Sequence, residues 1–169
     1  PPDITELEIK AVTEVLRSGW ITTGPVTGKL EERLASFTGT AGAVCLSSAT
    51  AAEELILRLL GIGPGDEVIV PAYTYSATAS AVIHTGARAV FVDAGPDGPQ
   101  MDYDAVERAV TPATKAIIPV DLGGVVCDYD RLYGIVEGTR KIFRPSSPFP
   151  PGQRIQEALG RVALVADCA

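Results

Sequence analysis

Short apolar runs and amphipathic segments alternate along most of this chain, and this alternation limits the folds open to it. Repeated strand–helix–strand order favours a parallel sheet with helices on both faces. The apolar runs are rich in Val, Ile and Ala, as expected of strands buried on both faces. The predicted fold class is therefore α/β, with a mostly parallel, doubly wound sheet. Strands are predicted over residues 43–46, 67–71, 89–92, 115–120 and 161–166, and helices over residues 50–60, 76–84, 102–110 and 128–136.

Two further helices are predicted before the alternation begins, over residues 3–16 and 26–37. A loop that carries the only tryptophan, Trp20, connects them. We therefore expect an N-terminal region over residues 1–37 and a partial large domain over residues 38–169. Because the chain opens directly on a helix start and stops just after a strand-like run, we expect it to be a fragment of a longer polypeptide.

Residues 138–160 interrupt the alternation. They carry basic side chains among prolines, a composition typical of a solvated surface loop. We interpret this basic, proline-rich excursion as such a loop rather than as a binding element. Its basic residues and prolines are Arg140, Lys141, Arg144, Arg154, Pro145, Pro148, Pro150 and Pro151.

Composition excludes several classes of partner. The formal net charge of −7 makes nucleic acid and anionic membrane surfaces poor candidates. No apolar run reaches membrane-spanning length, and no secretory signal pattern opens the chain. The three cysteines show no metal-binding or redox spacing, so we expect no metal site, reduced thiols and a cytoplasmic protein.

Small and hydroxyl residues fill the junction between the first predicted strand and its helix, over Ser47-Ser48-Ala49-Thr50-Ala51-Ala52. A helix start leaves backbone N–H groups free, and the helix dipole adds to their attraction for an anion. The backbone there is open to close approach, and Ser48 and Thr50 add hydroxyl donors. The sequence therefore predicts a phosphate site. The same residues are also consistent with a plain strand-to-helix turn with a hydroxyl cap.

Other polar groups follow the predicted strands. In an open α/β sheet, ligands bind beyond the carboxyl ends of the strands. Tyr73 and Tyr75 follow the second strand, Asp121 the fourth and Asp167 the last. A phosphate site, an aromatic face and carboxylates on one edge would suit a phosphorylated aromatic cofactor such as pyridoxal 5′-phosphate (PLP). We interpret Tyr73 as a core residue, and Asp167 is also consistent with a turn cap.

Taken in order, the motifs of this chain resemble the DegT-type, PLP-dependent sugar aminotransferases of fold type I. The order and spacing hold along nearly the whole chain, although each motif alone is weakly specific. The matching motifs are Gly19-Trp20-Ile21-Thr22-Thr23-Gly24-Pro25, Ser47-Ser48-Ala49-Thr50-Ala51-Ala52, Gly61-Ile62-Gly63-Pro64-Gly65-Asp66-Glu67-Val68-Ile69-Val70-Pro71, Tyr73-Thr74-Tyr75, Gly86-Ala87 with Val90-Phe91-Val92-Asp93, Thr114-Lys115-Ala116-Ile117 with Pro119-Val120, and Asp167-Cys168-Ala169.

The resemblance implies site roles. The backbone of Ala49 and Thr50, beside Ser48, would bind the cofactor phosphate, Tyr75 would stack on the pyridine ring, and Asp167 would pair with the ring nitrogen. The loop of Thr22, Thr23 and Gly24 would lie near the active-site mouth and contact substrate. Such enzymes transfer an amino group, usually from glutamate, to a keto group of a nucleotide-linked sugar in amino sugar biosynthesis, and are typically homodimers.

This chain departs from the family pattern at three places. The family commonly has Asn-Ser-Gly-Thr where this chain has Ser47-Ser48-Ala49-Thr50, and often His where this chain has Asp121. The excursion over residues 138–160 is longer than usual. By the resemblance, the Schiff-base lysine lies beyond the last residue, so we expect this fragment alone to be inactive.

Two alternatives remain beside the aminotransferase interpretation. Relatives with another residue at the lysine position act as PLP-dependent sugar dehydratases. The chain is also consistent with a non-catalytic domain that binds a phosphate ligand or a partner protein.

Overall fold

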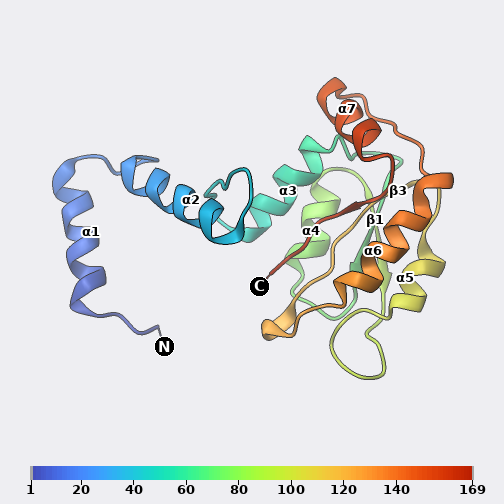
Figure 1. Ribbon diagram of the computed structural model, residues 1–169, viewed down its shortest axis with the longest axis horizontal. Helices are drawn as coiled ribbons and strands as arrows, with labels where there is room; N and C mark the ends of the chain where they lie inside the picture. The colour runs from blue at the N-terminus through green and yellow to red at the C-terminus, as the bar shows by residue number, and fades with distance from the viewer. Residues whose placement is uncertain (1, 169) are drawn as a thin grey trace. The chain divides into compact units, whose positions relative to one another are not determined.

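The computed structural model describes residues 2–168, which divide into two compact units, the first ending at Leu46 and the second beginning at Ser47 (Figure 1). The first unit holds two helices, and the second holds the sheet. None of the helices within residues 2–168 has the length and apolar composition needed to cross a bilayer.

The first unit confirms both predicted N-terminal helices, α1 (Glu6–Ser18) and α2 (Pro25–Thr38). The Thr5 hydroxyl group accepts the Leu7 N–H at the start of α1, and the Glu8 carboxylate accepts the Thr5 N–H, a reciprocal capping arrangement. Neither helix has a buried residue, so their apolar side chains are exposed.

The strand predicted over residues 43–46 is wrong. These residues are irregular, and the structure of residues 2–168 gives them no strand partner. A strand needs a hydrogen-bonded neighbour, and β-propensity alone does not supply one. The Cys45 N–H instead donates to the Glu31 carboxylate, at 2.8 Å.

The second unit contains a four-stranded, fully parallel sheet in the order β2-β1-β3-β4. Its strands are β1 (Glu67–Pro71), β2 (Arg88–Val92), β3 (Thr114–Ile117) and β4 (Ala163–Leu164). The last two are shorter than predicted, but their pairing resumes at an isolated bridge between Val120 and Asp167. The fold is α/β, as the alternation predicts.

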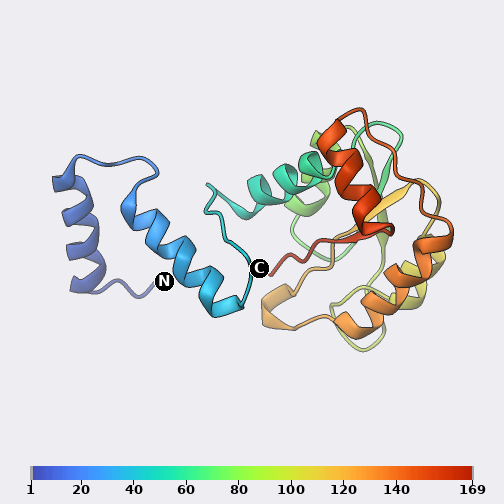
Figure 2. The same cartoon turned by 45° about the horizontal axis from the view of Figure 1, so that its top comes forward.

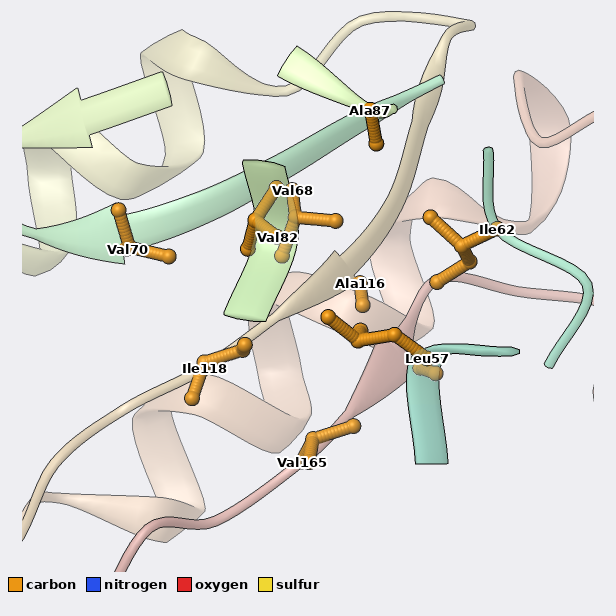
Figure 3. Close-up of a cluster of buried hydrophobic side chains, with 10 residues drawn as sticks. Leu57, Ile62, Val68, Val70, Val82, Ala87, Ala116, Ile118 and Val165 are labelled. Atoms are coloured by element: carbon orange, nitrogen blue, oxygen red, sulfur yellow. The ribbon is translucent and has the colours of Figure 1, made fainter. Parts of the chain in front are cut away.

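Helices cover both faces of this sheet. They are α3 (Ala49–Leu59), α4 (Ala77–His84), α5 (Tyr103–Ala109), α6 (Tyr129–Gly138) and α7 (Pro150–Leu159). Alternate strand residues divide between two apolar clusters. Val68 and Ile118 pack with Leu57 of α3 and Val82 of α4 on one face (Figure 3), whereas Ile69 belongs to the cluster on the other face. That second cluster also contains Val106 of α5 and Leu132 of α6, and α5 and α6 lie side by side.

The interpretation of residues 138–160 as a loop is wrong, because they contain α7 and a short 3-10 turn at Thr139–Lys141. Pro150 occupies the first position of α7, where its fixed φ suits a helix and its missing N–H costs nothing. The buried Gln156 amide donates to the carbonyl oxygens of Leu60 (2.8 Å) and Ser146 (3.1 Å). These bonds hold α7 against the end of α3. Figure 2 shows the two helices beside each other.

Candidate functional site

The N-terminus of α3 presents the predicted anion site. Ser48 is the N-cap, and its hydroxyl oxygen accepts the Ala51 N–H at 3.1 Å. The Ser48 carbonyl oxygen accepts the Ala52 N–H, also at 3.1 Å. No hydrogen bond within residues 2–168 engages the N–H of Ala49 or Thr50, which are the first two helical residues. Two N–H groups are therefore free for an anion at the positive end of the helix dipole.

The carboxyl ends of β3 and β4 bring two aspartates together. The Asp121 N–H donates to the Asp167 carbonyl oxygen at 2.8 Å, and the Asp167 N–H donates to the Pro119 carbonyl oxygen at 3.0 Å. The backbone at Asp167 is therefore fixed to the neighbouring strand, while its side chain is partly exposed. Asp167 thus lies where ligands of parallel α/β sheets bind.

The side chain of Asp121 is used within the protein. Its carboxylate accepts the Cys127 N–H at 2.8 Å and the Tyr129 hydroxyl group at 3.1 Å. Burial, together with this carboxylate, raises the pKa of the Cys127 thiol to about 11 and raises the pKa of Tyr129. Asp121 therefore orders the segment that leads into α6, which is a structural role.

Glu53 is a site residue that the sequence reasoning missed. It lies on α3 one turn after Ala49, is 5% exposed, and its Oε1 atom has no hydrogen-bond partner within residues 2–168. Leu57, one turn further along α3, packs in the same apolar cluster as Val165, which lies two residues before Asp167 on the same extended segment. Glu53 and Asp167 are therefore neighbours at this edge of the sheet. Burial first, and then the negative charge of Asp167, raise the pKa of Glu53 to about 7. The sequence did contain a signal for it. Glu53 lies four residues before the buried Leu57, so its carboxylate is on the apolar face of the helix.

Glu53 also shows that the start of α3 and Asp167 lie together. Because Glu53 is on the second turn of α3 and is a neighbour of Asp167, the free N–H groups and the aspartate belong to one edge of the sheet. The structure therefore brings two of the predicted site elements together.

The two tyrosines after β1 are exposed. Tyr75 is 79% and Tyr73 is 62% exposed, so the interpretation of Tyr73 as a core residue is wrong. The reason is that β1 ends at Pro71, and residues 72–74 form a bend after the strand. Tyr75 precedes α4, at the same carboxyl edge of the strands as Asp167, with its ring open to a ligand.

The predicted substrate loop belongs to the first unit. The Trp20 indole N–H donates to the Thr23 carbonyl oxygen at 2.9 Å and folds the loop back on itself. Gly24 lies directly under the ring, where a Cβ atom would come within 2.3 Å of Trp20. Thr22 and Gly24 line a hollow on this unit together with Trp20 and Ile21. Glycine is therefore required at position 24 for this loop shape.

Lys115 lies at the wrong end of the sheet to reach Asp167. It is 3% exposed near the start of β3, and its ammonium group donates to the Arg144 carbonyl oxygen at 2.5 Å. Asp121 follows the other end of that strand, so about 20 Å of extended chain separates the two edges. The sequence's other lysines, Lys10, Lys29 and Lys141, are exposed.

Comparison with known proteins identifies the family. The profile of the DegT/DnrJ/EryC1/StrS aminotransferase family matches residues 2–140, most of the chain. The chain belongs to this family. Like other members of the DegT/DnrJ/EryC1/StrS family, it is homologous to sugar aminotransferases, and its sheet and helices match part of a fold type I enzyme.

Among curated DegT/DnrJ/EryC1/StrS relatives, the chain is 48% identical over 136 residues to UDP-4-amino-4-deoxy-L-arabinose–oxoglutarate aminotransferase of Shewanella sediminis. It is 46% identical over 136 residues to the spore coat polysaccharide biosynthesis protein SpsC of Bacillus subtilis. Each match covers 80% of this chain and 35% of the relative. The chain thus spans about a third of the length of these relatives.

A solved structure of a candidate sugar aminotransferase from Streptococcus pneumoniae is similar along the whole chain. The identity is 56% and the TM-score is 0.93, with 100% of this chain and 41% of that chain covered. That protein has been solved with pyridoxamine phosphate (PMP) and with PLP. The similarity includes residues 141–168, which the family profile does not match.

Proposed function

We propose that the full-length protein that contains this chain is a PLP-dependent aminotransferase that converts a nucleotide-linked keto-sugar to an amino sugar. The observation that carries the proposal is the shared position of the α3 N-terminus and Asp167, which Glu53 connects. The homology to sugar aminotransferases supports the same assignment.

The residues of this chain fit PLP. The free N–H groups of Ala49 and Thr50, with the Ser48 hydroxyl group, suit a phosphate dianion. The exposed ring of Tyr75 is available to stack on a flat heterocycle. The Asp167 carboxylate is an acceptor for a protonated ring nitrogen, and its negative charge would keep the proton there.

These residues would bind and orient rather than react. When bound, PLP would supply an aldehyde carbon that carries the amino group from one carbon skeleton to another and a ring that withdraws electrons. Ala49 and Thr50 would fix one end of the cofactor, and Asp167 would hold a proton at the other end. Two fixed ends and a stacked face would leave one orientation for the reacting atoms, which is how positioning contributes to rate.

Membership of the family supports proposals for the substrates and the assembly. The Shewanella relative acts on UDP-4-amino-4-deoxy-L-arabinose and oxoglutarate, which supports glutamate as the amino donor here. The resemblance to the family supports the proposal that the loop of Thr22, Thr23 and Gly24 contacts the nucleotide sugar. We also expect a homodimer, because the exposed apolar side chains of α1 and α2, such as Leu7, Val12 and Phe37, form the kind of surface that assembly buries.

Two measurements on the full-length protein test this proposal. Adding PLP should give a new visible absorption band that saturates with cofactor concentration. Incubating the loaded protein with glutamate should then release oxoglutarate in a single turnover, before any sugar is added. Absence of both signals at saturating cofactor would contradict the proposal.

A further inference from the structure

The buried carboxyl group of Glu53 is the least explained polar group in the second unit. Folding removes it from water, yet its Oε1 atom has no partner within residues 2–168. Burying an unpaired carboxylate is costly, and a protein avoids that cost when the group takes up a proton or finds a charge partner. The retention of a carboxyl group here therefore calls for a role.

The neighbour of Glu53 limits what that role can be. The packing of Leu57 against Val165 makes Glu53 a neighbour of Asp167, which is also an acid. Two carboxylates cannot hydrogen-bond to each other unless one holds a proton. Glu53 is the more buried of the two, so the proton belongs on Glu53 and the negative charge on Asp167.

Other charged groups near α3 do not neutralise Glu53. His84 of α4 pairs with Glu54 at 2.9 Å, and Arg58 pairs with the same carboxylate at 2.8 Å. Two other titratable groups lie at that edge. The Asp121 carboxylate accepts the Cys127 N–H and the Tyr129 hydroxyl group, and the Cys168 thiol is exposed. The remaining charged residues on α7, which packs against α3, are Arg154 and Glu157, both exposed.

We propose that Glu53 is a positioning residue for Asp167. Its protonated carboxyl group donates a hydrogen bond to the Asp167 carboxylate and holds that carboxylate facing the ring nitrogen of the cofactor. This inference rests on the proposed function. In this arrangement the pair holds one proton, on Glu53, and one negative charge, on Asp167.

The position of Glu53 explains why α3 would carry this group. The same helix offers its first N–H groups to the phosphate and, one turn later, a hydrogen-bond donor to Asp167. A single rigid element would then set the distance between the two ends of the cofactor. Rigid support of this kind is what a precise binding site requires.

The first test needs no cofactor. In the cofactor-free full-length protein labelled with ¹³C at Glu carboxyl carbons, the signal that Glu53→Gln removes should titrate near pH 7. Asp167→Asn should lower that pKa, because it removes a negative neighbour. The inference would be overturned by a Glu53 signal that titrates near pH 4.5, or by a Glu53 pKa that is the same in Asp167→Asn and wild type.

The second test measures PLP affinity from the visible absorbance of the full-length protein. Glu53→Leu should weaken binding roughly tenfold, the loss expected of a hydrogen bond to a charged group. Glu53→Gln should restore most of that loss, because its amide is a permanent donor of similar shape. Glu54→Gln, the same change one residue along the helix, is the matched control. Equal affinity of Glu53→Leu and wild type would overturn the inference.

The two failures can be told apart. If wild type itself binds no PLP, the proposed function fails, while the carboxyl titration still decides whether Glu53 and Asp167 share a proton. If wild type binds PLP and Glu53→Leu binds it equally well, only the role of Glu53 fails.

Discussion

Lys115 and Asp66 form a buried pair at the amino edge of the sheet, with the ammonium nitrogen 3.9 Å from the nearer carboxylate oxygen. Burial lowers the pKa of Lys115 and raises the pKa of Asp66. The Asp66 carboxylate also accepts the Gly63 N–H at 3.0 Å. The buried pair at the amino edge therefore contributes to stability, whereas the candidate site lies at the opposite, carboxyl edge of the sheet.

Replacing one member of this pair should be costly. We expect Lys115→Met to lower the free energy of unfolding by about 3 kcal/mol, because it leaves the Asp66 carboxylate buried and unpaired. Urea denaturation measures this. The double variant Lys115→Met/Asp66→Asn should recover part of the loss, and a single variant as stable as wild type would show that the pair is unimportant.

Ala49 allows one N–H of the anion site to be removed alone. Proline is tolerated at the first position of a helix, and Ser48 before it is already extended, with φ −163° and ψ 161°. We expect Ala49→Pro to leave the free energy of unfolding within about 0.5 kcal/mol of wild type. It should nevertheless weaken PLP binding about tenfold, because a charge-assisted hydrogen bond is lost. Ala49→Ser, which keeps the N–H, is the control, and unchanged affinity of Ala49→Pro would place the phosphate elsewhere.

Stability should depend on pH through Glu53. Its pKa is raised from 4.5 to about 7 in the folded protein, so its contribution to stability is full below pH 4.5 and is lost as the pH rises to 7. The loss is at most about 3.5 kcal/mol, since one pKa unit is worth about 1.4 kcal/mol. Denaturation curves of the cofactor-free protein between pH 4.5 and 8 measure it. Glu53→Gln should flatten this part of the profile and Glu54→Gln should not; equal slopes in Glu53→Gln and wild type would argue against a buried, proton-binding Glu53.

Asp167→Asn tests the role of the ring-nitrogen partner. The variant should still bind PLP through the N–H groups of Ala49 and Thr50, but turnover should fall by about 100-fold or more, because the ring nitrogen would no longer be held protonated. Steady-state transamination and absorbance titration of the same preparation separate the two effects. Wild-type turnover in this variant would remove the assigned role.

Gly152 should be essential to the packing of α7. A Cβ atom there would lie 2.6 Å from the Gly61 backbone, so Gly152→Ala forces α7 away from the end of α3. We expect a loss of about 1–3 kcal/mol in unfolding free energy, the usual cost of overpacking. Gly134→Ala in α6 is the matched change, because nothing lies within 4 Å of its Cβ position, and it should stabilise slightly. Equal effects of the two changes would contradict the packing argument.

The sequence predicts the second unit well because its signals are local. Strand β1 has the predicted bounds, and the caps at Ser48, Asp102 and Asp128 start their helices close to the expected residues. These features depend on residue types within a few positions of each other, such as a hydroxyl or carboxylate cap before an apolar periodic run.

The errors arise where neighbours distant in sequence decide the structure. Residues 43–46 have strand composition but no strand partner among the described residues. The prolines of residues 138–160 predict a loop, although Pro150 at the first position of α7 favours a helix. The packing of α7 depends on Leu60, which is distant in sequence. The sequence places Glu53 on the apolar face of its helix, but only the fold shows that this face meets Asp167.

The most direct test of the central claim is a crystal structure of the full-length protein with PLP bound. The account predicts that phosphate oxygens lie about 3 Å from the backbone nitrogens of Ala49 and Thr50, and that the ring nitrogen lies about 3 Å from the Asp167 carboxylate. A cofactor bound away from α3, or a ring nitrogen that faces a residue other than Asp167, would contradict it.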